Sequence, residues 1–580
     1  MSQVKGIPYG ISDFKRLRNE NFYYVDKTMY LPLIEKMPSY LFLIRPRRFG
    51  KSLFLSLMRT YYDILQKDNF EKYFGDLWIG SHPTDQRNRF QVLYFDFSKA
   101  GYSQPGADMM TSFNDYCSLI INQFAHEYAS FYDTDFKATI ESIESAKAKL
   151  LYIEIKAKEK GHPLYLIVDE YDNFTNVILS EHGQKMFHDL THASGFYREY
   201  FKQFKGMFDR IFLMGVSPIT LDDLSSGYNI DWNISTDETF NAMMGFDETD
   251  VREMFHYYRQ NDMLTGDIDT MIAEMKPWYN NYCFARMALD SDRVFNCDMI
   301  LYYLHNQVNF HRAPEDMIDK NICINYSKLK KLTGINHKSL HEDSCMNTIK
   351  DIVAKGEVLV DLHTSFPAEK VTDIDNFRSL LYYYGLLTMC GTHGKLLKMC
   401  IPNNCVREQY FGFLRDYYQQ FHTINLSHLK DLIDDFAYDG QWKPFFESIA
   451  LAYRENSSVR DAMEGERNLQ GFLKAYLALA SYYLVEPELE MNYGYCDFFL
   501  LPDKKRYPDI GHSYILELKY AGRTTTDTEL ETQAEEGRRQ LLQYSKDKIA
   551  LQLAQDTTLH LILLQFRGWD LVKCEEIASC

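Results

Sequence analysis

The sequence predicts an α/β protein of several domains, whose N-terminal half is a mainly parallel sheet with helices on both faces. Short apolar runs recur in the first 290 residues with amphipathic helical stretches between them, as in parallel strands joined by crossover helices. One run leads into a Gly-Lys-Ser triplet, and another ends in two acidic residues. At 580 residues the chain exceeds one ordinary core, so roughly two to four domains are expected.

The first predicted strand lies in YLFLIRPRRFGKS, residues 40–52, where an apolar run passes through basic residues into Gly50. A strand, a loop and a helix N-terminus in this order form a phosphate-binding P-loop. In such a loop Lys51 reaches the β- and γ-phosphates and the Ser52 hydroxyl ligates Mg²⁺. The first glycine of the pattern G-x-x-x-x-G-K-[ST] is replaced by Arg45, so the motif is incomplete. The candidate nucleotide-binding residues of the loop are Arg45, Arg47, Arg48, Phe49, Gly50, Lys51 and Ser52.

A second strand is predicted at residues 164–168, an apolar run followed directly by Asp169 and Glu170. Acids at the C-terminal end of a buried parallel strand lie where ligands bind in open α/β sheets. We expect Asp169 to hold the Mg²⁺ shell and Glu170 to polarise the attacking water. The runs 92–97 and 211–216 fit the same sheet, and Ser217 after the latter can contact the γ-phosphate or the water.

Each of these signals has a plain structural alternative. A Gly-Lys-Ser triplet is common in loops, and an acidic pair after an apolar run is often a strand exit or a helix cap. Arg47 and Arg48 either contact phosphate or solvate the loop. The order of the signals along alternating strands and helices favours nucleotide binding. Hydrolysis has less support, because Arg45 alters the loop and no arginine finger can be assigned from spacing.

Composition limits the class of protein further. The hydrophobic fraction of 46% and the aromatic fraction of 15% indicate a folded chain. No apolar run approaches the ~20 residues that span a bilayer, and the N-terminus lacks a signal-peptide core, so a cytoplasmic protein without membrane contact is expected. Eleven cysteines show no zinc-type spacing and are interpreted as reduced thiols. The net charge of −18 argues against general coating of nucleic acid but permits a local basic channel.

The middle of the chain, residues 291–435, is predicted to be helical with one hairpin at 386–401. Helices followed by a small hairpin are compatible with a winged-helix-like module. A helical connector between the flanking domains fits the pattern equally well. Near the N-terminus, residues 6–28 either pack over a nucleotide base or form a structural lead-in helix.

A second group of chemical residues lies in the C-terminal part, residues 436–580. In the predicted strand HSYILELKY, Glu517 and Lys519 are two residues apart and therefore project from the same face. Asp497 lies in the preceding strand candidate, and a loop with prolines and glycine between them suits a hairpin-type connection. Two carboxylates and an ammonium group are what metal-assisted phosphodiester cleavage requires, with Asp497 and Glu517 as the metal ligands.

Other residues extend this group. Glu466 begins a helix with an apolar stripe, so its carboxylate can point into the same site. Gln540 and Tyr544 share one helical face, beside a basic edge that can follow phosphates: Arg538, Arg539, Lys546 and Lys548. An E-x-K triplet alone occurs readily by chance on a solvated strand. The full order of residues favours a nuclease-type fold with Glu466, Asp497, Glu517 and Lys519 as catalytic residues.

These motifs together resemble the bacterial AAA-ATPase-like proteins fused to a C-terminal nuclease domain of the PD-(D/E)XK superfamily. The resemblance runs through GIPYGISDF, YYVDKT, RPRRFGKS, IVDEYDN, GVSPIT, SLLYYYGLLT, IPNNCVR, GERNLQGFL, GYCDFFL and ILELKY. It implies that arginine at the position of Arg45 is usual. It also implies a P-loop core with an additional strand, a restriction-endonuclease-like C-terminal domain and Mg²⁺ as the nuclease metal, with Mn²⁺ as a substitute. The expected domains are 1–290, 291–435 and 436–580.

The leading hypothesis is an enzyme that binds ATP, hydrolyses it and cleaves nucleic acid under nucleotide control, DNA more than RNA. One alternative is a nucleotide-switched binding or signalling protein whose nuclease-like domain does not cleave. Another is a motor ATPase, which requires a ring or a processive oligomer. A homo-oligomer stays open at this point, and the sequence identifies neither the substrate nor the effect of ATP on cleavage.

Overall fold

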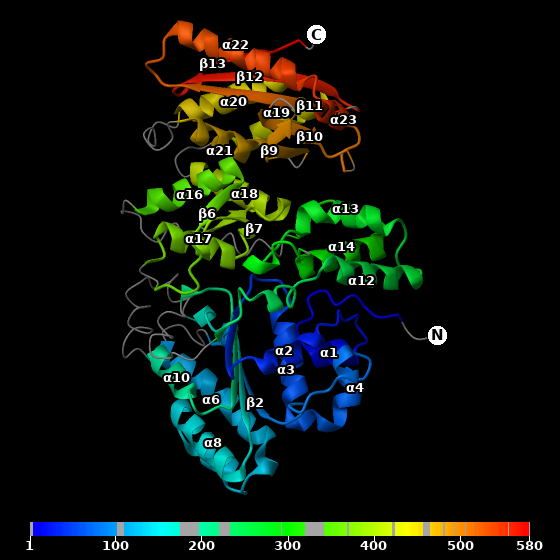
Figure 1. The fold of residues 1–580 in the computed structure, drawn as a ribbon, viewed down its shortest axis with the longest axis vertical. Helices are drawn as coiled ribbons and strands as arrows, with labels where there is room; N and C mark the ends of the chain where they lie inside the picture. The colour runs from blue at the N-terminus through cyan, green and yellow to red at the C-terminus, as the bar shows by residue number, and fades with distance from the viewer. Residues whose placement is uncertain are drawn as a thin grey trace. The chain divides into compact units, whose positions relative to one another are not determined.

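The structure is a computed structural model of the 580-residue chain (Figure 1). It describes residues 4–100, 109–174, 196–219, 232–291, 293–319, 341–367, 370–419, 424–455, 465–479, 482–491, 494–504, 506–554 and 556–578. The chain divides into two compact units. The first comprises Met1–His337 and Leu359–Asn404, and the second Lys338–Val358 and Cys405–Cys580. The predicted division at residues 290 and 435 stays a prediction.

The first unit is built around a five-stranded sheet in the order β2-β3-β4-β1-β5. The strands are β1 (Tyr40–Ile44), β2 (Gln91–Asp96), β3 (Leu164–Asp169), β4 (Arg210–Gly215) and β5 (Trp232–Asn233). All of their pairings are parallel. The four predicted apolar runs therefore form adjacent strands, and the predicted parallel α/β class is confirmed.

Helices surround this sheet. Helix α3 (Lys51–Tyr62) follows β1, while α6 (Met109–Glu127) and α8 (Ala146–Lys160) lie between β2 and β3 in the chain. The other α-helices in the described part of this unit are α1 (Phe14–Asn19), α2 (Leu31–Lys36), α4 (Phe70–Phe74), α5 (Trp78–Ser81), α7 (Phe136–Ser142), α10 (Phe196–Phe204), α12 (Glu248–Gln260), α13 (Ile268–Tyr279), α14 (Cys297–Phe310) and α17 (Ile374–Tyr383).

The predicted hairpin at 386–401 is confirmed as β7 (Thr388–His393) and β8 (Leu396–Cys400), which pair antiparallel. A third strand, β6 (Glu357–Val360), lies on the other side of β8. The chain passes from the second unit into the first within β6, and it returns at the start of α18 (Asn404–Gln419).

The second unit has a mixed five-stranded sheet in the order β13-β12-β11-β10-β9. Its strands are β9 (Tyr483–Met491), β10 (Gly494–Pro502), β11 (His512–Ala521), β12 (Thr558–Arg567) and β13 (Asp570–Glu576). Strands β11 and β12 pair parallel, and the other neighbours pair antiparallel. The remaining helices are α16 (His341–Lys355), α19 (Leu426–Tyr438), α20 (Trp442–Glu455), α21 (Glu466–Leu477), α22 (Asp527–Tyr544) and α23 (Lys548–Leu553).

The sheet of the second unit is buried on both faces. Leu541 and Tyr544 of α22 pack with Phe499, Ile515 and Leu563 in one hydrophobic cluster. Against the other face, Phe436 of α19 stacks on Tyr514 with ring centroids 4.1 Å apart. Within the described residues, no helix has the length and apolar character needed to cross a membrane.

Two candidate active sites

The first candidate site lies where β1 runs into α3. Gly50 adopts a left-handed backbone with φ of 82°, which lets the loop turn into the helix. The Lys51 ammonium is buried, donates to the Pro46 carbonyl oxygen at 3.0 Å and lies 4.0 Å from a carboxylate oxygen of Glu170. The loop and the end of β3 thus meet around Lys51, as the order of the motifs predicts.

Asp169 and Glu170 close this site from β3. The Asp169 side chain is 2% exposed, and Tyr94 donates to its Oδ2. Burial raises the pKa of Asp169 to about 6, and the Glu170 charge adds to the rise while a Ser52 hydrogen bond and Lys51 oppose it. Glu170 has a positive φ of 51°, a strained conformation that concentrates at functional sites.

The donor set fits a hard divalent cation. The Oδ1 atom of Asp169 is buried and makes no hydrogen bond of normal geometry within the described parts of the chain. The Ser52 hydroxyl lies beside the same carboxyl group. A carboxylate oxygen and a hydroxyl oxygen are ligands that Mg²⁺ accepts when phosphates and water complete its shell.

Two of the predicted loop residues, Arg45 and Phe49, are held by contacts within the first unit. The Arg45 side chain is 1% exposed, and its guanidinium donates to the carbonyl oxygens of Ile44 at 3.0 Å, Ser235 at 2.6 Å and Phe240 at 2.9 Å. It also stacks over the Phe284 ring at 4.3 Å. Because these contacts use the guanidinium inside the unit, it anchors the base of the loop.

Phe49 is likewise an anchor, since its buried ring meets Tyr282 and Phe284 edge-on. Arg48 is exposed, has a positive φ of 68° and pairs with Asp298 at 3.1 Å. Arg47 is half-buried and lines a cavity of about 660 Å³ together with Ser52, Asp169 and Glu170. Arg47 is therefore the loop arginine that faces this cavity.

Ser217 is fully buried at the end of β4. Its backbone N–H donates to Asp172 at 2.9 Å, and its carbonyl oxygen accepts a hydrogen bond from Tyr171 at 2.7 Å. Asp172 thereby ties the exit of β3 to the exit of β4. A Cβ at Gly215 would lie 2.4 Å from the Asp172 carboxylate, so the two exits approach too closely for any other residue. Sequence reasoning missed both Asp172 and Gly215, although the motifs IVDEYDN and GVSPIT contain them.

The second candidate site lies on β10 and β11. The antiparallel pairing of Phe498 with Leu516, continued by one residue, puts Asp497 opposite Glu517. Asp497 Oδ2 accepts the Leu518 backbone N–H at 2.7 Å, which fixes its carboxylate. Glu517 is 3% exposed, and its Oε2 has no hydrogen-bond partner within the described residues.

Lys519 completes the group. Its ammonium donates to Glu517 Oε1 at 2.8 Å and to Gln540 Oε1 of α22 at 2.7 Å. Burial raises the pKa of both Asp497 and Glu517, and their mutual repulsion adds to the rise for Glu517 while Lys519 opposes it. The two neighbouring carboxylates resist ionisation, and one buried carboxylate oxygen has no partner among the described residues. A divalent cation bound between them would stabilise their charged forms.

The outer residues of this group lie around the pair. Glu466 begins α21, is exposed, and its charge raises the pKa of Asp497. Gln470, one turn later, donates to Asp497 at 3.4 Å. Tyr544 is buried, and its pKa is raised by burial and by the charge of Glu517. Among the described residues, no group of three or more His, Cys, Asp and Glu side chains is arranged to hold a metal ion.

Comparison with known proteins decides the family. Residues 8–225 match the family model of predicted AAA-ATPases, and residues 464–576 match that of the PD-(D/E)XK nuclease superfamily. The chain is a fusion of an AAA-ATPase-like domain and a PD-(D/E)XK nuclease domain. Domains of these two classes use nucleotides and divalent metals in general. The fusion that the sequence motifs predict is confirmed.

Two individual proteins are also similar. An uncharacterised protein in the vnfD 5′ region of Azotobacter chroococcum mcd 1 is 29% identical over 282 residues. That match spans 48% of this chain and 48% of the relative, so it covers about half the length of either protein. The Aeropyrum pernix ORC1 protein in complex with DNA matches 70% of this chain and 93% of its own, with 9% identity and a TM-score of 0.25.

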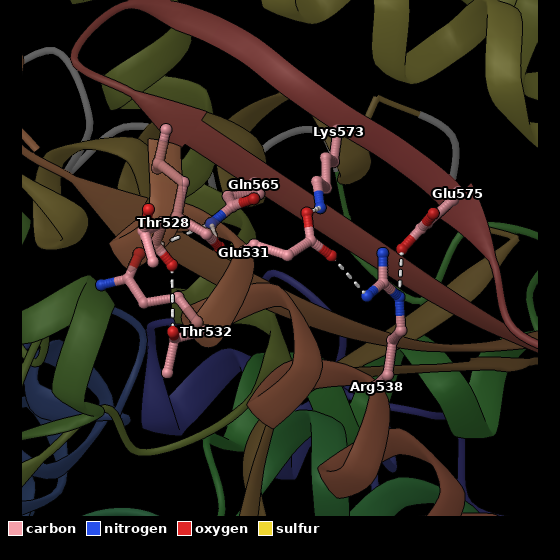
Figure 2. Close-up of polar contacts among 9 residues, drawn as sticks. Thr528, Glu531, Thr532, Arg538, Gln565, Lys573 and Glu575 are labelled. Carbon is pink, nitrogen blue, oxygen red and sulfur yellow. Dashed lines mark hydrogen bonds and ion pairs between the residues drawn. The ribbon is translucent and has the colours of Figure 1, made fainter. Parts of the chain in front are cut away.

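The predicted basic edge of the PD-(D/E)XK domain is partly neutralised. Figure 2 shows Arg538 of α22 between two acids, with Glu531 at 2.9 Å and Glu575 of β13 at 2.8 Å. Lys573, two residues before Glu575 on β13, pairs with Glu531. Arg539, Lys546 and Lys548 are exposed. Sequence spacing identified the cations of this edge but not the two acids that pair with Arg538, Glu531 on α22 and Glu575 on β13.

Proposed function

We propose that this protein binds and hydrolyses ATP in its AAA-ATPase-like domain and cleaves nucleic acid, under nucleotide control, in its PD-(D/E)XK domain. The observation that carries the proposal is the arrangement of Asp497, Glu517 and Lys519. The buried Glu517 carboxylate and the half-buried Asp497 carboxylate lie opposite each other, one Glu517 oxygen has no partner among the described residues, and an ammonium lies 2.8 Å from the other. This arrangement is costly in a bare protein and useful in a metal-dependent hydrolase.

In the AAA-ATPase-like domain, the loop and the α3 N-terminus would bind the phosphates, with Gly50 and Lys51 at their centre. Ser52 and Asp169 would hold Mg²⁺, which supplies charge neutralisation of the β- and γ-phosphates when it is bound. Glu170 would orient the attacking water, and Ser217 would contact the γ-phosphate or that water. Arg47 would face the phosphates from the cavity, whereas Arg45 and Phe49 would keep the loop in shape.

A small, mainly apolar cavity beside the loop suits the nucleotide base. It has a volume of about 80 Å³ and is lined by Tyr24, Gly50, Leu53 and Met244 among others. Tyr24 belongs to the N-terminal segment for which base packing is one of the two predicted roles. We assign the adenine ring to this cavity, because an apolar lining next to a phosphate loop matches an aromatic base.

In the PD-(D/E)XK domain, Asp497 and Glu517 would bind Mg²⁺, or Mn²⁺ in its place, which supplies an activated water and stabilises the charge on the phosphate. Lys519 would orient the water and steady the developing negative charge. Gln540 holds the ammonium of Lys519 at 2.7 Å, and Glu466 would contribute a further carboxylate at the edge of the site.

The substrate that fits is nucleic acid, with DNA favoured over RNA. Arg539, Lys546 and Lys548 are exposed on or just after α22 and would contact phosphates, while the net charge of −18 disfavours binding elsewhere. We place the protein in the cytoplasm without membrane attachment, and we leave a homo-oligomer open.

The test uses purified full-length protein and labelled single- and double-stranded DNA and RNA, with Mg²⁺ or Mn²⁺ and with or without ATP. Glu517→Ala is expected to abolish cleavage and to leave ATP binding intact, while Lys51→Ala is expected to lose ATP binding and change the rate of cleavage. Glu535→Ala, at an exposed position of α22, is the matched control. Full cleavage by Glu517→Ala would reject the assignment.

A second candidate function has one observation in its favour. Lys519 already neutralises Glu517 at 2.8 Å, and the described residues contain no group of three metal-binding side chains. A nucleotide-switched protein whose PD-(D/E)XK domain binds nucleic acid without cleaving it fits that arrangement. Isothermal titration with Mn²⁺ separates the two, because the nuclease binds the metal through Asp497 and Glu517 and the switch protein does not.

A further inference from the structure

The C-terminal end of α17 packs against the P-loop and against the ends of β3 and β4 in the proposed nucleotide site. The helix ends at Tyr383, Tyr384 is its C-cap residue, and Gly385 follows with a φ of 74°. The Gly385 N–H donates to Tyr382 and the Leu386 N–H to Leu381, both at 2.9 Å, so the end is closed by local hydrogen bonds. This helix end lies in the motif SLLYYYGLLT, which has no role in the function proposed above.

Its first contact is with the P-loop. A Cβ at Gly385 would lie 2.8 Å from Cβ and 2.9 Å from Cγ of Pro46. The helix end therefore touches the loop at a position where no side chain fits. Pro46 is also the residue whose carbonyl oxygen holds the Lys51 ammonium at 3.0 Å.

Its second contact is with the ends of β3 and β4. The buried Tyr384 side chain is hydrogen-bonded to the side chain of Ser217, and it lies close enough to Asp172 and Arg47 for their charges to act on it. Tyr171, which directly follows Glu170, lies beside Tyr383 and Tyr384 and donates to the Ser217 carbonyl oxygen at 2.7 Å. One helix end thus joins the loop, the acidic strand end and the serine strand end.

The same helix end leads directly to the second unit. From Gly385 the chain runs through β7 and β8 into α18, where the second unit resumes. This path is fastened to the first unit on the way: the Thr388 hydroxyl accepts the Cys283 N–H at 2.8 Å, and the Asn403 amide donates to the Asn280 carbonyl oxygen at 3.0 Å. The path from the α17 end to α18 is therefore anchored to the first unit at two points.

We propose that the α17 end, Tyr384 and Gly385, changes its packing when the P-loop site binds a nucleotide, and that this change is transmitted along the chain toward the PD-(D/E)XK domain. Tyr384 is a positioning residue that acts through Ser217, and Gly385 is the contact with Pro46. This inference rests on the proposed nucleotide site, because the α17 end can respond to a nucleotide only if the P-loop binds one.

The experiment uses the full chain and a non-hydrolysable ATP analogue. Hydrogen–deuterium exchange of the wild-type protein is expected to slow by about tenfold over β7 and β8 when the analogue binds, because the bound phosphates fix Pro46 and Ser217. Tyr384→Phe removes the hydroxyl and keeps the ring, so it is expected to lose this protection while binding the analogue within about twofold of wild type.

The adjacent Tyr383→Phe is the matched control, because the Tyr383 hydroxyl is buried and has no hydrogen-bond partner within the described part of the chain. It is expected to keep the protection. In ATP hydrolysis, Tyr384→Phe is expected to lower kcat about tenfold with KM unchanged, a split that general loss of structure would not give.

Gly385→Ala gives an independent check. It is expected to weaken analogue binding, because its Cβ pushes Pro46, whereas Gly394→Ala in the β7–β8 turn carries the same backbone strain and meets no atom within 4 Å. If the wild type binds no nucleotide, the proposed function and this inference fall together. If it binds nucleotide but β7 and β8 exchange as before, or if Tyr384→Phe behaves like Tyr383→Phe, this inference alone is wrong.

Discussion

At the scale of single residues, the buried Asp169 carboxyl makes stability depend on pH. Its pKa is about 6 in the folded chain against an ordinary value of 3.8, so ionisation is harder in the folded than in the unfolded protein. Below about pH 3 both states are protonated, so this carboxyl costs the folded state no stability. As pH rises to about 6 the unfolded state ionises first, and the folded state loses as much as about 3 kcal/mol, at 1.36 kcal/mol for each pKa unit.

Asp169→Asn is therefore expected to stabilise the nucleotide-free protein above about pH 6 and to leave its stability unchanged near about pH 3. Thermal unfolding of both proteins from about pH 3 to about pH 8 without metal measures this difference. The variant is also expected to lose ATP hydrolysis, since it lacks the carboxylate that would hold Mg²⁺. A variant that melts below the wild type at pH 8 would show that the Asp169 charge is stabilising in the bare site.

Arg45 illustrates what could and what could not be predicted from the sequence. The missing glycine of the motif is visible in the sequence, but the partners of the arginine are the carbonyl oxygens of Ser235 and Phe240, about two hundred residues away. No spacing rule predicts such contacts. Asp169 and Glu170 could be placed, by contrast, because an apolar run fixes both the strand and the position of its end.

Restoring the motif glycine is expected to harm the protein. Arg45→Gly removes a buried cation from three carbonyl oxygens and from the Phe284 ring, and it should lower the free energy of unfolding by more than about 3 kcal/mol and weaken ATP binding. Arg48→Gly is the control: Arg48 is exposed with a positive φ, which glycine adopts without strain, so a change within about 1 kcal/mol is expected. Chemical unfolding and ATP titration of both variants give the comparison.

At the scale of elements, the approach of α22 to β11 controls the position of Lys519. A Cβ at Gly537 would lie 2.7 Å from Leu563 Cδ1 and 3.4 Å from Lys519 Cε, so the helix backbone rests almost directly on the sheet. Gln540, one turn later, then reaches the Lys519 ammonium at 2.7 Å. The sequence predicts the strand, the helix and the Gln540 face from their periodicities, but close contact at Gly537 depends on which strands lie beneath it.

Gly537→Ala is expected to push α22 away from β11, break the bond between Gln540 and Lys519, and lower cleavage by about tenfold or more with ATP binding unchanged. Helix propensity alone favours alanine over glycine by about 1 kcal/mol, so Gly537→Ala would stabilise the protein if propensity dominated and destabilise it if the close contact with the sheet dominated. Glu536→Ala, at the preceding exposed position, is the control and should keep full cleavage. Cleavage rates and thermal unfolding of the two variants measure the effect; full activity of Gly537→Ala would show that the helix can move without cost.

At the scale of the whole molecule, the two units are not continuous in the chain. The second unit takes in Lys338–Val358, far from the predicted start of its domain at residue 436. The reason is physical: the buried Lys474 of α21 donates to the carbonyl oxygens of Val353 at 3.0 Å and Ala354 at 2.8 Å, at the C-terminal end of α16. Sequence patterns give no information on contacts between distant residues and therefore suggest only contiguous domains. The assignment of residues 338–358 to the second unit could not be predicted for this reason.

A fragment 436–580, cut at the boundary that the sequence suggests, is therefore expected to fold poorly. Without α16 the Lys474 ammonium, 1% exposed in the full chain, loses the two carbonyl oxygens that hold it. Lys474→Met should consequently raise the melting temperature of the fragment and lower that of the full chain, since only the full chain has favourable partners to lose. Circular dichroism melts of the fragment and the full chain, each with and without Lys474→Met, measure the two changes in melting temperature. If the fragment is as stable as the full chain, or if the substitution changes the melting temperature in the same direction in both, α16 is not needed for the PD-(D/E)XK domain.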